Sequence, residues 1–557
     1  MADILELQEV QFKPRAYRNA ARAIETLSED IEETYKKNKL QEIPGVGESI
    51  AEKIEEYIKT GKISAYEKLK KEVKIDLESL ESIPGLGPKK IKIFYQKLNI
   101  KNIKDLEKAI EQHKLQKISG FGEETEENLK RGIELVKSHP KRFLYAHALP
   151  IVNQIKSYFQ KYSFIKKFEV AGSFRRGKET VGDLDFIAVS DQPEKVMELF
   201  IKIPDVKEVI AKGSTKSSIR LSNGLQIDLR VVKEEEFGSA LLYFIGNKEH
   251  NVEIRKLALS KSYTLNEYGL FNLKTKKRIA GRTEQEIYDK LGLQYIEPEM
   301  RENMGELKLS QQHKLPNLVT DKDIKGVFHN HSQWSDGNNT LSEMIKKAEE
   351  LKLKFISFND HFSNIGIVNP LNEKRLISYL KEIEKLKKKS RIKIFTGIEI
   401  DIQKDGTLAL SNNLLKKLDV VIASVHTSLN MPEKEMTARI CHALENYPIH
   451  ILGHPTGIVL NNRPAYEVNL EKVYETAKKN NVFLEINSLP SRMDLNGEKI
   501  KAAKEIGCKF VLSADAHNTL ELGYFPFGVL CARRGWLEKK DILNCWDLKK
   551  IVTALKR

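Results

Sequence analysis

The sequence predicts a multidomain protein with a helical front end, an α+β middle region and a C-terminal barrel of alternating strands and helices. The chain has 557 residues, more than one hydrophobic core usually serves. A Gly-x-Gly pattern recurs three times among helical stretches before residue 140. After residue 325, seven short apolar runs end in polar residues, and helical stretches separate most of them.

The charge balance favours a polyanionic partner. Lys and Arg number 93 against 78 Asp and Glu, which gives a formal net charge of +15. Nucleic acid is the simplest such partner, although a basic solvated surface would give the same balance. The four cysteines lie far apart without a C-x-x-C pair, as in a reduced cytoplasmic protein. The sequence shows neither an N-terminal apolar segment nor a long apolar run, so we expect no secretion and no membrane partner.

Residues 1–140 carry Leu, Ile, Lys and Glu at helical spacing, interrupted by Gly and Pro. The three glycine pairs are Gly45 and Gly47, Gly85 and Gly87, and Gly120 and Gly122, each before an amphipathic helix. Such a turn presents backbone N–H groups at the positive end of a helix dipole, which suits a DNA phosphate and reads no base. The pattern resembles the helix-hairpin-helix motif, and three copies favour non-specific DNA binding over plain helix–helix turns.

Lys53 lies on the helix behind the first hairpin. A lysine beside DNA can attack a sugar aldehyde as a Schiff-base nucleophile if its pKa is lowered. An ordinary phosphate-contacting or solvated lysine is at least an equal alternative. Lys53 is therefore a candidate lyase nucleophile only.

A metal-and-phosphate site is predicted in the middle region. Asp183 and Asp185 lie two apart at the entry of an apolar strand, so they share a face. Two like charges so close need a positive partner, and the usual candidate is a divalent cation. The turn before them brings the backbone of Gly172, the hydroxyl of Ser173 and the guanidinium of Arg176, which suit a phosphate. The alternative is a solvated charged turn, but the combination favours a metal-bound triphosphate.

A third carboxylate completes this site. Asp228 lies in an alternating strand, on the face opposite the apolar residues. If that strand pairs beside Asp185, three carboxylates meet. They would hold two Mg²⁺ or Mn²⁺ ions for an in-line phosphoryl displacement.

These motifs resemble the family X DNA polymerases of the nucleotidyltransferase superfamily. The resemblance implies a palm and a thumb, and a monomeric repair enzyme that adds dNTPs to a primer 3′ end in gapped or nicked duplex DNA. Residues 241–246 resemble the family's Y-F-T-G turn, which holds the sugar of the incoming nucleotide. The residues that the resemblance adds to the nucleotide site are Gly182, Tyr243, Phe244, Gly246, Asn251 and Arg255. Lys53 matches the family's Schiff-base lysine.

The chain departs from the family pattern at four positions. Ile245 and Asn247 replace the usual Thr and Ser of the turn, which bears on nucleotide handling. Gln226 stands where better-known members carry an Arg that contacts the primer end. Ser49 stands where a second lysine often accompanies the lyase lysine, which weakens the lyase prediction.

Histidines concentrate in the last region, where eight of the 13 follow residue 325 and six of these end apolar runs. Barrels of parallel strands keep their chemistry at the strands' C-terminal ends. The predicted ligands are His329, His331, Glu399 and Asp515 for a first metal; Glu399, His426 and His454 for a second; and His361, His517 and Asp336 for a third. One strand-end histidine is more often a core residue, but six with three carboxylates favour Mn²⁺, Zn²⁺ or Fe²⁺, up to three ions.

This pattern resembles the PHP (polymerase and histidinol phosphatase) domain, with all nine ligand positions filled. The resemblance implies a distorted (β/α)7 barrel and hydrolysis of a phosphoester at a metal site. Joined to a family X polymerase, it resembles the bacterial and archaeal form, in which this domain is a 3′–5′ exonuclease, an AP endonuclease or a 3′-phosphatase. Arg463, Arg492, Arg533 and Arg534 are expected to contact the substrate's phosphates, and His442 and His450 to be structural.

The expected domains are 1–80 (lyase-like), 81–145 (fingers), 146–235 (palm), 236–297 (thumb), 298–325 (linker) and 326–557 (PHP). The expected location is the cytoplasm, at the nucleoid. Two other interpretations stay open: an end-processing phosphoesterase whose polymerase half mainly binds DNA, and a non-enzymatic repair scaffold. Primer extension on a gapped template and the metal content of the purified chain would separate them.

Overall fold

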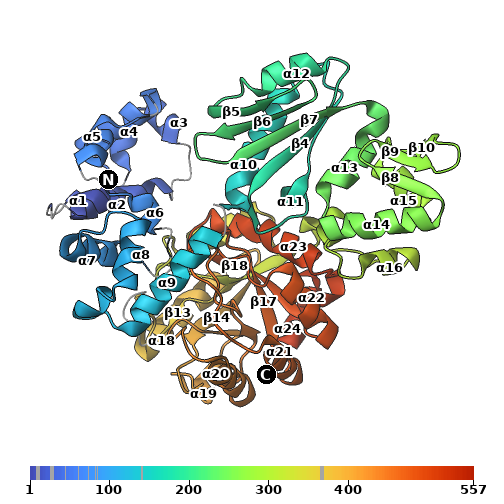
Figure 1. Cartoon of the computed structure of the whole chain (residues 1–557). Helices are drawn as coiled ribbons and strands as arrows, with labels where there is room; N and C mark the ends of the chain where they lie inside the picture. Colours follow the sequence, from blue (N-terminus) through green and yellow to red (C-terminus); the bar gives the residue numbers. More distant parts are fainter. Residues whose placement is uncertain are drawn as a thin grey trace. The chain divides into compact units, whose positions relative to one another are not determined.

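The structure is a computed structural model (Figure 1), and it describes residues 1–556 except 8–9, 11–12, 26–30, 44, 61, 73–74, 82, 84–85, 139–141 and 364–368. The chain forms two compact units. The first comprises Met1–Lys141 with Asn461–Pro464, and the second comprises Arg142–Leu460 with Ala465–Arg557.

The first unit is helical throughout its described residues. Its elements are α1 Ala2–Leu7, α2 Lys13–Glu25, α3 Ile31–Lys36, η1 Leu40–Glu42, α4 Glu48–Thr60, α5 Ser64–Glu72, α6 Leu77–Glu81, α7 Pro88–Leu98, α8 Ile103–Glu111, η2 Leu115–Lys117 and α9 Glu123–Ser138. Helices α4, α7 and α9 each begin directly after the second glycine of a predicted hairpin. Buried Leu80, Ile91, Leu106 and Leu115 belong to one core that joins the last two hairpins.

The second unit begins with a five-stranded sheet in the order β2-β4-β7-β6-β5. Its strands are β2 Lys167–Val170, β4 Asp183–Val189, β5 Val206–Lys212, β6 Lys216–Leu221 and β7 Gln226–Val232; β1 Phe143–Leu144 and β3 Thr180–Val181 pair apart from it. Helices α10 Tyr145–Phe159 and α12 Pro193–Phe200 share a core with Leu184 and Phe186 on one face of the sheet. Helix α13 Phe237–Ile245 packs with Ile187 and Val189 on the other face, and the short α11 Gly172–Arg175 contributes Phe174 to the first core.

A smaller region follows, with α14 Lys248–Ser260, β8 Tyr263–Asn266, β9 Gly269–Asn272, β10 Arg278–Ala280 and α15 Glu284–Lys290. The segment expected to be a linker is folded: it contains η4 Pro298–Met300, α16 Glu306–Gln311 and η5 Asp321–Asp323. Arg301 and Glu306 in it are fully buried. Arg301 pairs with Glu284 at 2.5 Å and Glu306 with His250 at 2.8 Å. The sequence of this segment looks polar because its charges serve as buried partners.

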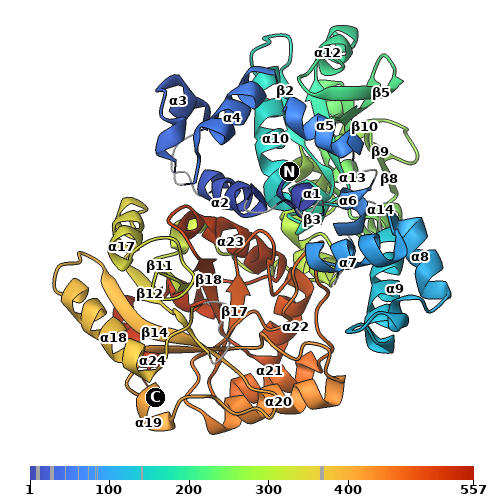
Figure 2. The ribbon, with the colours of Figure 1, turned by 90° about the vertical axis from the view of Figure 1, so that its left-hand side faces the viewer.

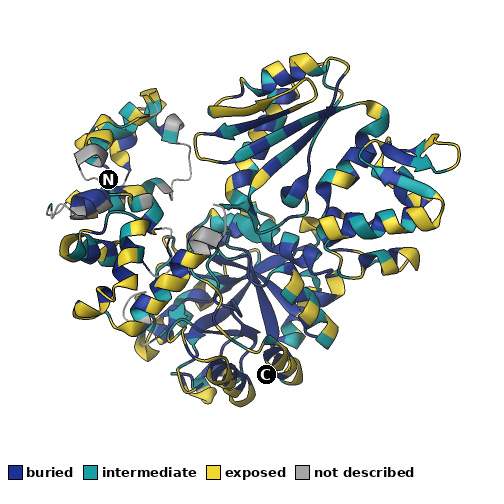
Figure 3. Cartoon of the chain, viewed as in Figure 1, coloured by how far each residue is buried: buried dark blue, intermediate teal, exposed yellow. Residues whose placement is uncertain are grey.

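The C-terminal part is a closed barrel of seven parallel strands, as predicted. The strands are β11 Gly326–Asn330, β12 Phe355–Phe358, β14 Lys393–Asp401, β15 Val420–Ser424, β16 Ile451–Leu452, β17 Phe483–Asn487 and β18 Phe510–Ala516, and the β12–β14 pairing closes the ring. The two-residue β13 His361–Phe362 joins beside β14. Figure 3 shows these strands almost wholly buried.

Helices lie around the outside of the barrel (Figure 2): α17 Leu341–Glu350, α18 Glu373–Lys387, α19 Asn412–Leu415, α20 Glu433–Asn446, α21 Leu470–Lys479, α22 Gly497–Ile506 and α23 Phe525–Arg534. Ile551 of α24 Leu548–Ala554 packs with Phe355, Val420 and Ile451, the first residues of three strands. The C-terminal segment therefore covers the end of the barrel at which the strands begin. Within the described residues, no helix is long and apolar enough to cross a bilayer.

Candidate functional site

The three predicted carboxylates of the middle region lie on two adjacent parallel strands. In the β4–β7 register, Asp185 stands beside Asp228 and Asp183 beside Gln226. Burial, Asp183 and Asp228 raise the pKa of Asp185 to about 7, although Arg230 and Arg176 lower it. Burial and Asp228 also raise the pKa of Asp183. The site therefore concentrates negative charge in a partly buried place, which is the electrostatic condition for binding cations.

The glycine-rich turn packs directly against this cluster. Gly172 has a φ of +63°, and a Cβ added there would lie 2.5 Å from the Asp185 carboxylate. Only glycine lets the backbone approach that closely. Arg176, expected to hold the triphosphate, donates its Nε–H to Glu302 at 3.0 Å and bonds to the carbonyl of Ile245. Its phosphate role stays a prediction, as do those of Gly172, Ser173 and Gly182.

The expected sugar-reading turn is tied to the next helix by hydrogen bonds. Asn251 donates its amide to the carbonyl of Tyr243 at 2.6 Å, and Arg255 donates to the carbonyl of Asn251 at 3.0 Å. Tyr243, Asn251 and Arg255 line one small cleft. Phe244 makes an edge contact with Tyr243 and accepts the Arg230 guanidinium over its ring at 4.4 Å. Gly246 follows with a φ of +73°. The residues that the resemblance named here are therefore close together.

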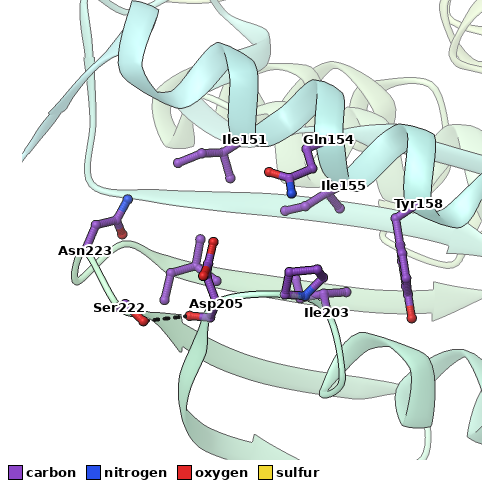
Figure 4. Close-up of a pocket in the computed structure, with 10 residues that line it drawn as sticks. Ile151, Gln154, Ile155, Tyr158, Ile203, Asp205, Ser222 and Asn223 are labelled. Carbon is purple, nitrogen blue, oxygen red and sulfur yellow. Dashed lines mark hydrogen bonds between the residues drawn. The ribbon is translucent and has the colours of Figure 1, made fainter. Parts of the chain in front are cut away.

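A wider cleft lies elsewhere in the second unit (Figure 4). It measures about 260 Å³ and is lined by Ile151, Ile155, Tyr158, Asp205, Ser222 and Asn223, among others. One wall of this cleft is α10, which packs on the face of the sheet that carries Leu184 and Phe186. Side chains alternate along β4, so Asp183 and Asp185 point to the opposite face. This cleft is therefore separate from the carboxylates.

All nine predicted ligands of the last region gather at the C-terminal ends of the barrel strands. They form three overlapping groups: His329, His331 and Asp515; His361, Glu399 and His426; and His331, Asp336, His361 and His517. Within each group, the potential ligand atoms lie within 4.8 Å of one another. His454 joins the second group, with its Nε2 3.1 Å from Glu399 and 3.2 Å from the Nε2 of His426. The grouping differs from the prediction in that His331 and His361 each belong to two groups.

The electrostatics of this cluster are strongly perturbed. Burial alone would lower the pKa of His426, but Glu399 and Asp401 raise it to about 10. Asp336 and Asp515 likewise raise the pKa of His517 to about 9 against the effect of burial. Burial, His517 and His361 lower the pKa of His331 to about 3. Without metal, His426 and His517 are therefore protonated beside charged carboxylates and His331 is neutral, as in a site where a bound cation takes the place of protons.

Three of the ligands also have an unusual backbone. His329, His454 and Asp515 have φ values of 58°, 25° and 48°, in the left-handed region that non-glycine residues rarely adopt. Such conformations persist only where the surrounding structure enforces them, and they occur often at functional sites. Here they turn each ligand at the end of its strand.

The hairpins of the first unit are exposed where they are described. Gly45 and Gly120 have φ values of +79° and +91°, and a Cβ at Gly47, Gly87 or Gly122 would meet nothing within 4 Å. Gly85 lies outside the described residues. Lys53 is half-buried and donates to the carbonyl and hydroxyl of Ser49 at 2.7 and 2.9 Å. DNA binding by the hairpins and a lyase role for Lys53 remain predictions.

Comparison with known proteins gives four family matches: a helix-hairpin-helix domain at residues 1–63, a SAM-like helix-hairpin-helix tandem at 77–134, a DNA polymerase beta thumb at 240–302 and a PHP domain at 328–489. The chain is also 37% identical over 549 residues to a Bacillus subtilis (strain 168) protein named DNA polymerase/3′-5′ exonuclease PolX. That alignment covers 98% of this chain and 95% of the relative. The chain belongs to the family X DNA polymerases that carry a PHP domain.

Shorter relatives share part of this family X chain. A probable phosphatase of Thermoanaerobacter sp. (strain X514) is 29% identical over 251 residues, covering 43% of this chain and 95% of the relative. A probable phosphatase of Clostridium novyi (strain NT) is 30% identical over 227 residues, covering 39% and 88%.

The residues of this polymerase fit the metals that the family implies. In the barrel, Nε2 of His329, both ring nitrogens of His331 and Nδ1 of His454 are buried without a hydrogen-bond partner. Buried polar atoms are seldom left unsatisfied, and a bound cation would engage these imidazoles. Three carboxylates in the polymerase site supply the oxygen ligands that Mg²⁺ and Mn²⁺ prefer.

Sequence reasoning missed residues that orient these ligands. Glu485, fully buried in β17, accepts from Nδ1 of His329 at 2.5 Å and from the backbone N–H of His454 at 2.5 Å. Asp401 similarly contacts Nδ1 of His426. Each carboxylate leaves the Nε2 of its histidine directed at the cluster. The sequence signal that could have identified Glu485 is a carboxylate inside an otherwise apolar strand.

Arg142 was also missed. Its Nη1 lies 3.4 Å from where a Cβ of Gly182 would be, and its charge lowers the pKa of Asp183 against burial. It donates to the hydroxyl and carbonyl of Thr180 at 2.9 and 2.8 Å. Arg142 therefore adds positive charge at the edge of the carboxylate site.

Arg533 and Arg534 lie in helix α23 rather than in a loop. Arg533 pairs with the half-buried Glu299 at 2.8 Å and Arg534 with the half-buried Glu179. Arg492 lies 3.5 Å from the Asp515 carboxylate, close to the ligand cluster. His450 is structural, as expected, because Nδ1 accepts from the Val421 N–H and Nε2 meets the Leu555 carbonyl.

Proposed function

We infer that this chain is a repair DNA polymerase that adds dNTPs to a primer 3′ end and carries a separate 3′–5′ exonuclease in its PHP barrel. The observation that supports this most is the presence of two distinct ligand clusters on two sheets of one chain. One is a carboxylate triad on β4 and β7, and the other is the nine-ligand set at the barrel's strand ends. The nearly full-length likeness to a protein named DNA polymerase/3′-5′ exonuclease PolX supports the same assignment.

In nucleotide addition, the primer 3′-oxygen forms a bond to the α-phosphorus as the bond to the leaving diphosphate breaks. Asp183, Asp185 and Asp228 would hold two Mg²⁺ or Mn²⁺, which lower the pKa of the attacking hydroxyl and neutralise the leaving diphosphate. Gln226 donates to Oδ1 of Asp228 at 3.1 Å and so fixes the orientation of that carboxylate. Gln226 thereby has a role in this chain at the position where relatives carry Arg.

The proposed nucleotide contacts follow from the same geometry. Gly172 and Ser173 would offer backbone N–H and hydroxyl donors to the triphosphate, and Arg176 a positive charge beside them. Tyr243 and Phe244 would bound the sugar, and Asn251 and Arg255 would approach the nascent base pair. Gly182 would allow close backbone approach next to Arg142.

In the barrel, we propose that the nine ligands bind up to three Mn²⁺, Zn²⁺ or Fe²⁺ ions. The ions would supply a nucleophilic water and neutralise the phosphoester charge during hydrolysis. Glu485 and Asp401 hold His329 and His426 in the tautomer that presents Nε2. The hydrolysed bond is the 3′-terminal phosphodiester, which leaves a new 3′-hydroxyl for extension.

The DNA substrate proposed is a gapped or nicked duplex, bound by a monomer through the hairpins at Gly45–Gly47, Gly85–Gly87 and Gly120–Gly122. Their exposed turns would contact phosphates and read no sequence. Lys53 would be the nucleophile if the first unit has lyase activity. We place the enzyme in the cytoplasm at the nucleoid.

The test is a labelled one-nucleotide gapped duplex with either a matched or a mismatched 3′ end. With dNTPs and Mg²⁺ or Mn²⁺, the matched end should be extended by one nucleotide. With Mn²⁺ and without dNTPs, both ends should shorten stepwise. If the chain binds the gapped duplex but extends the primer with neither Mg²⁺ nor Mn²⁺, the proposed polymerase activity is refuted. That result would favour an end-processing phosphoesterase whose polymerase half only binds DNA.

A second activity of the same barrel is favoured by the relatives named probable phosphatases. We propose that the barrel also removes a 3′-phosphate. A primer that ends in a 3′-phosphate should release inorganic phosphate and then become extendable. Stepwise loss of whole nucleotides without free phosphate would limit the barrel to phosphodiesters.

A further inference from the structure

Residues 176–179, at the end of the proposed triphosphate turn, contact two other parts of the second unit: Glu302 and helix α23. Arg176 and Lys178 both pair with Glu302, at 3.0 and 3.2 Å. Gly177 lies so close to Leu530 that an added Cβ would be 2.4 Å from its side chain. Glu179 pairs with Arg534. All four residues 176–179 are therefore held by Glu302 or by helix α23.

Helix α23 belongs to the PHP barrel. Its residues Val529, Cys531 and Ala532 are buried in the barrel's main core. Its other face carries Leu530 and Arg534 toward the polymerase, and Phe527 makes an edge contact with Tyr145, which stacks on Phe174 of α11 at 4.4 Å. The helix that completes the barrel thus also packs behind the turn that is proposed to bind the triphosphate.

Arg534 is the central charge of this contact. Its side chain is 3% exposed, and besides Glu179 it approaches Glu302 at 3.9 Å. Glu302 itself is 6% exposed and also accepts from the Asn247 amide at 3.2 Å, beside the sugar-reading turn. Burial would raise the pKa of Glu302, but Arg176, Lys178 and Arg534 lower it. The carboxylate is thus charged and shared among the turn, the thumb and α23.

We propose that helix α23 of the PHP barrel positions the triphosphate-binding turn of the polymerase site, with Arg534 as the positioning residue. The barrel would then be required for nucleotide binding as well as for hydrolysis. The proposal rests on the proposed nucleotidyl transfer at Asp183, Asp185 and Asp228. Arg534 is not among the residues proposed to bind the nucleotide or the metals; it acts through Glu179 and through the Glu302–Arg176 pair.

The experiment is steady-state insertion of one labelled dNTP into a gapped duplex by the full chain, with KM for dNTP and kcat determined separately. For Arg534→Gln, KM for dNTP should rise about tenfold, near the middle of the range for residues that act through others. At saturating dNTP, kcat should stay within about threefold, because the reacting groups are untouched. Arg534→Lys keeps the charge and should recover most of the lost affinity.

Arg533→Gln is the matched control. Arg533 is the adjacent residue of the same helix and pairs with Glu299 and Glu297, whereas Arg534 pairs with Glu179 and Glu302. This variant should leave KM for dNTP within about twofold of wild type. The exonuclease rate of each variant, measured without dNTPs, reports whether the barrel is folded and should stay unchanged.

An unchanged KM for dNTP in folded Arg534→Gln overturns the proposal. An equal rise in Arg533→Gln also overturns it, because the effect would then be a general loosening of the contact. If Arg534→Gln loses its exonuclease through misfolding, Glu179→Gln decides, because it removes the same ion pair from the polymerase side. A raised KM for dNTP with a normal exonuclease rate supports the proposal, and an unchanged KM refutes it. Absence of insertion by the wild-type chain refutes the proposed function instead.

Discussion

Replacing Asp185 by Asn removes a carboxylate whose ionisation the fold opposes. Burial, Asp183 and Asp228 raise its pKa to about 7 from the ordinary 3.8. Because the folded pKa lies above the unfolded one, the group's stabilising contribution is complete below about pH 4 and is lost as the pH rises through 7. The metal-free protein is therefore less stable at pH 8 than the same fold with a neutral side chain.

The loss of folding stability follows from the difference between the folded and unfolded pKa of Asp185. At about 1.36 kcal/mol for each tenfold change in acidity, an ordinary pKa of 3.8 and a folded pKa of about 7 give roughly 4 kcal/mol at pH 8. At pH 5 only the ionisation of the unfolded chain contributes, which leaves under about 2 kcal/mol. With an unfolding entropy near 2.1 cal/mol/K per residue, 4 kcal/mol corresponds to about 5 °C for a unit of this size.

The assay is thermal unfolding of wild type and Asp185→Asn at pH 5 and pH 8, with chelator and with Mg²⁺. With chelator at pH 8 the variant should melt about 5 °C higher, and the gain should shrink at pH 5. Mg²⁺ should raise the melting temperature of the wild type and not that of the variant. Asp191→Asn, an exposed carboxylate paired with Lys166 just beyond the same strand, is the control and should change little. A variant less stable than wild type at pH 8 without metal would refute the argument.

Three further predictions concern both sites. Glu485→Gln should weaken Mn²⁺ binding by the metal-free chain 10- to 100-fold, because the carboxylate accepts from both His329 and His454, whereas Gln has one amide oxygen and no charge. Equal affinity by calorimetry would contradict this, and exposed Glu498→Gln is the control. The pKa values of about 10 for His426 and about 9 for His517 mean that a metal ion must displace protons from these imidazoles. The apparent Mn²⁺ affinity should therefore rise between pH 6 and 9, and an affinity that does not change with pH would contradict this prediction. Gly172→Ala should reduce nucleotide addition at least about 100-fold, since its Cβ would meet the Asp185 carboxylate, and should leave exonuclease rates unchanged; loss of both activities would argue against a local effect.

Much of the fold was predictable from the spacing of apolar residues and from the Gly and Pro residues that separate helices and strands. The alternation of short apolar runs with helices predicted the barrel, and its closure by β12–β14 pairing is the natural end of that pattern. The pairing of Asp185 with Asp228 was expected as a condition for a metal site, because Asp228 lies on the polar face of an alternating strand and would complete the carboxylate set. Ligands at strand ends gather wherever parallel strands form a ring, so the nine ligands came together without any long-range information.

The spacing of apolar residues could not predict which charged side chains form ion pairs and hydrogen bonds with one another. Glu485 lies in a buried run that looks like plain core, and only the three-dimensional proximity of His329 gives it a role. Segment 298–325 looks polar and free, but Arg301 and Glu306 are buried by partners far away in sequence. Arg534 follows a barrel strand and looked like a substrate contact, yet it pairs with Glu179, 355 residues earlier. Ion pairs of this kind leave no local pattern.

The central claim is that one chain holds two chemically independent sites, and one measurement tests it most directly. Each of four full-length variants, Asp183→Asn, Asp228→Asn, His331→Asn and Asp515→Asn, is given a labelled gapped duplex with and without dNTPs, and addition and removal are followed on the same gel. We expect the first two to lose addition at least about 1000-fold and to keep removal, and the last two to do the reverse. A folded variant that loses both activities, or a variant of the triad that loses only removal, would contradict the two-site account.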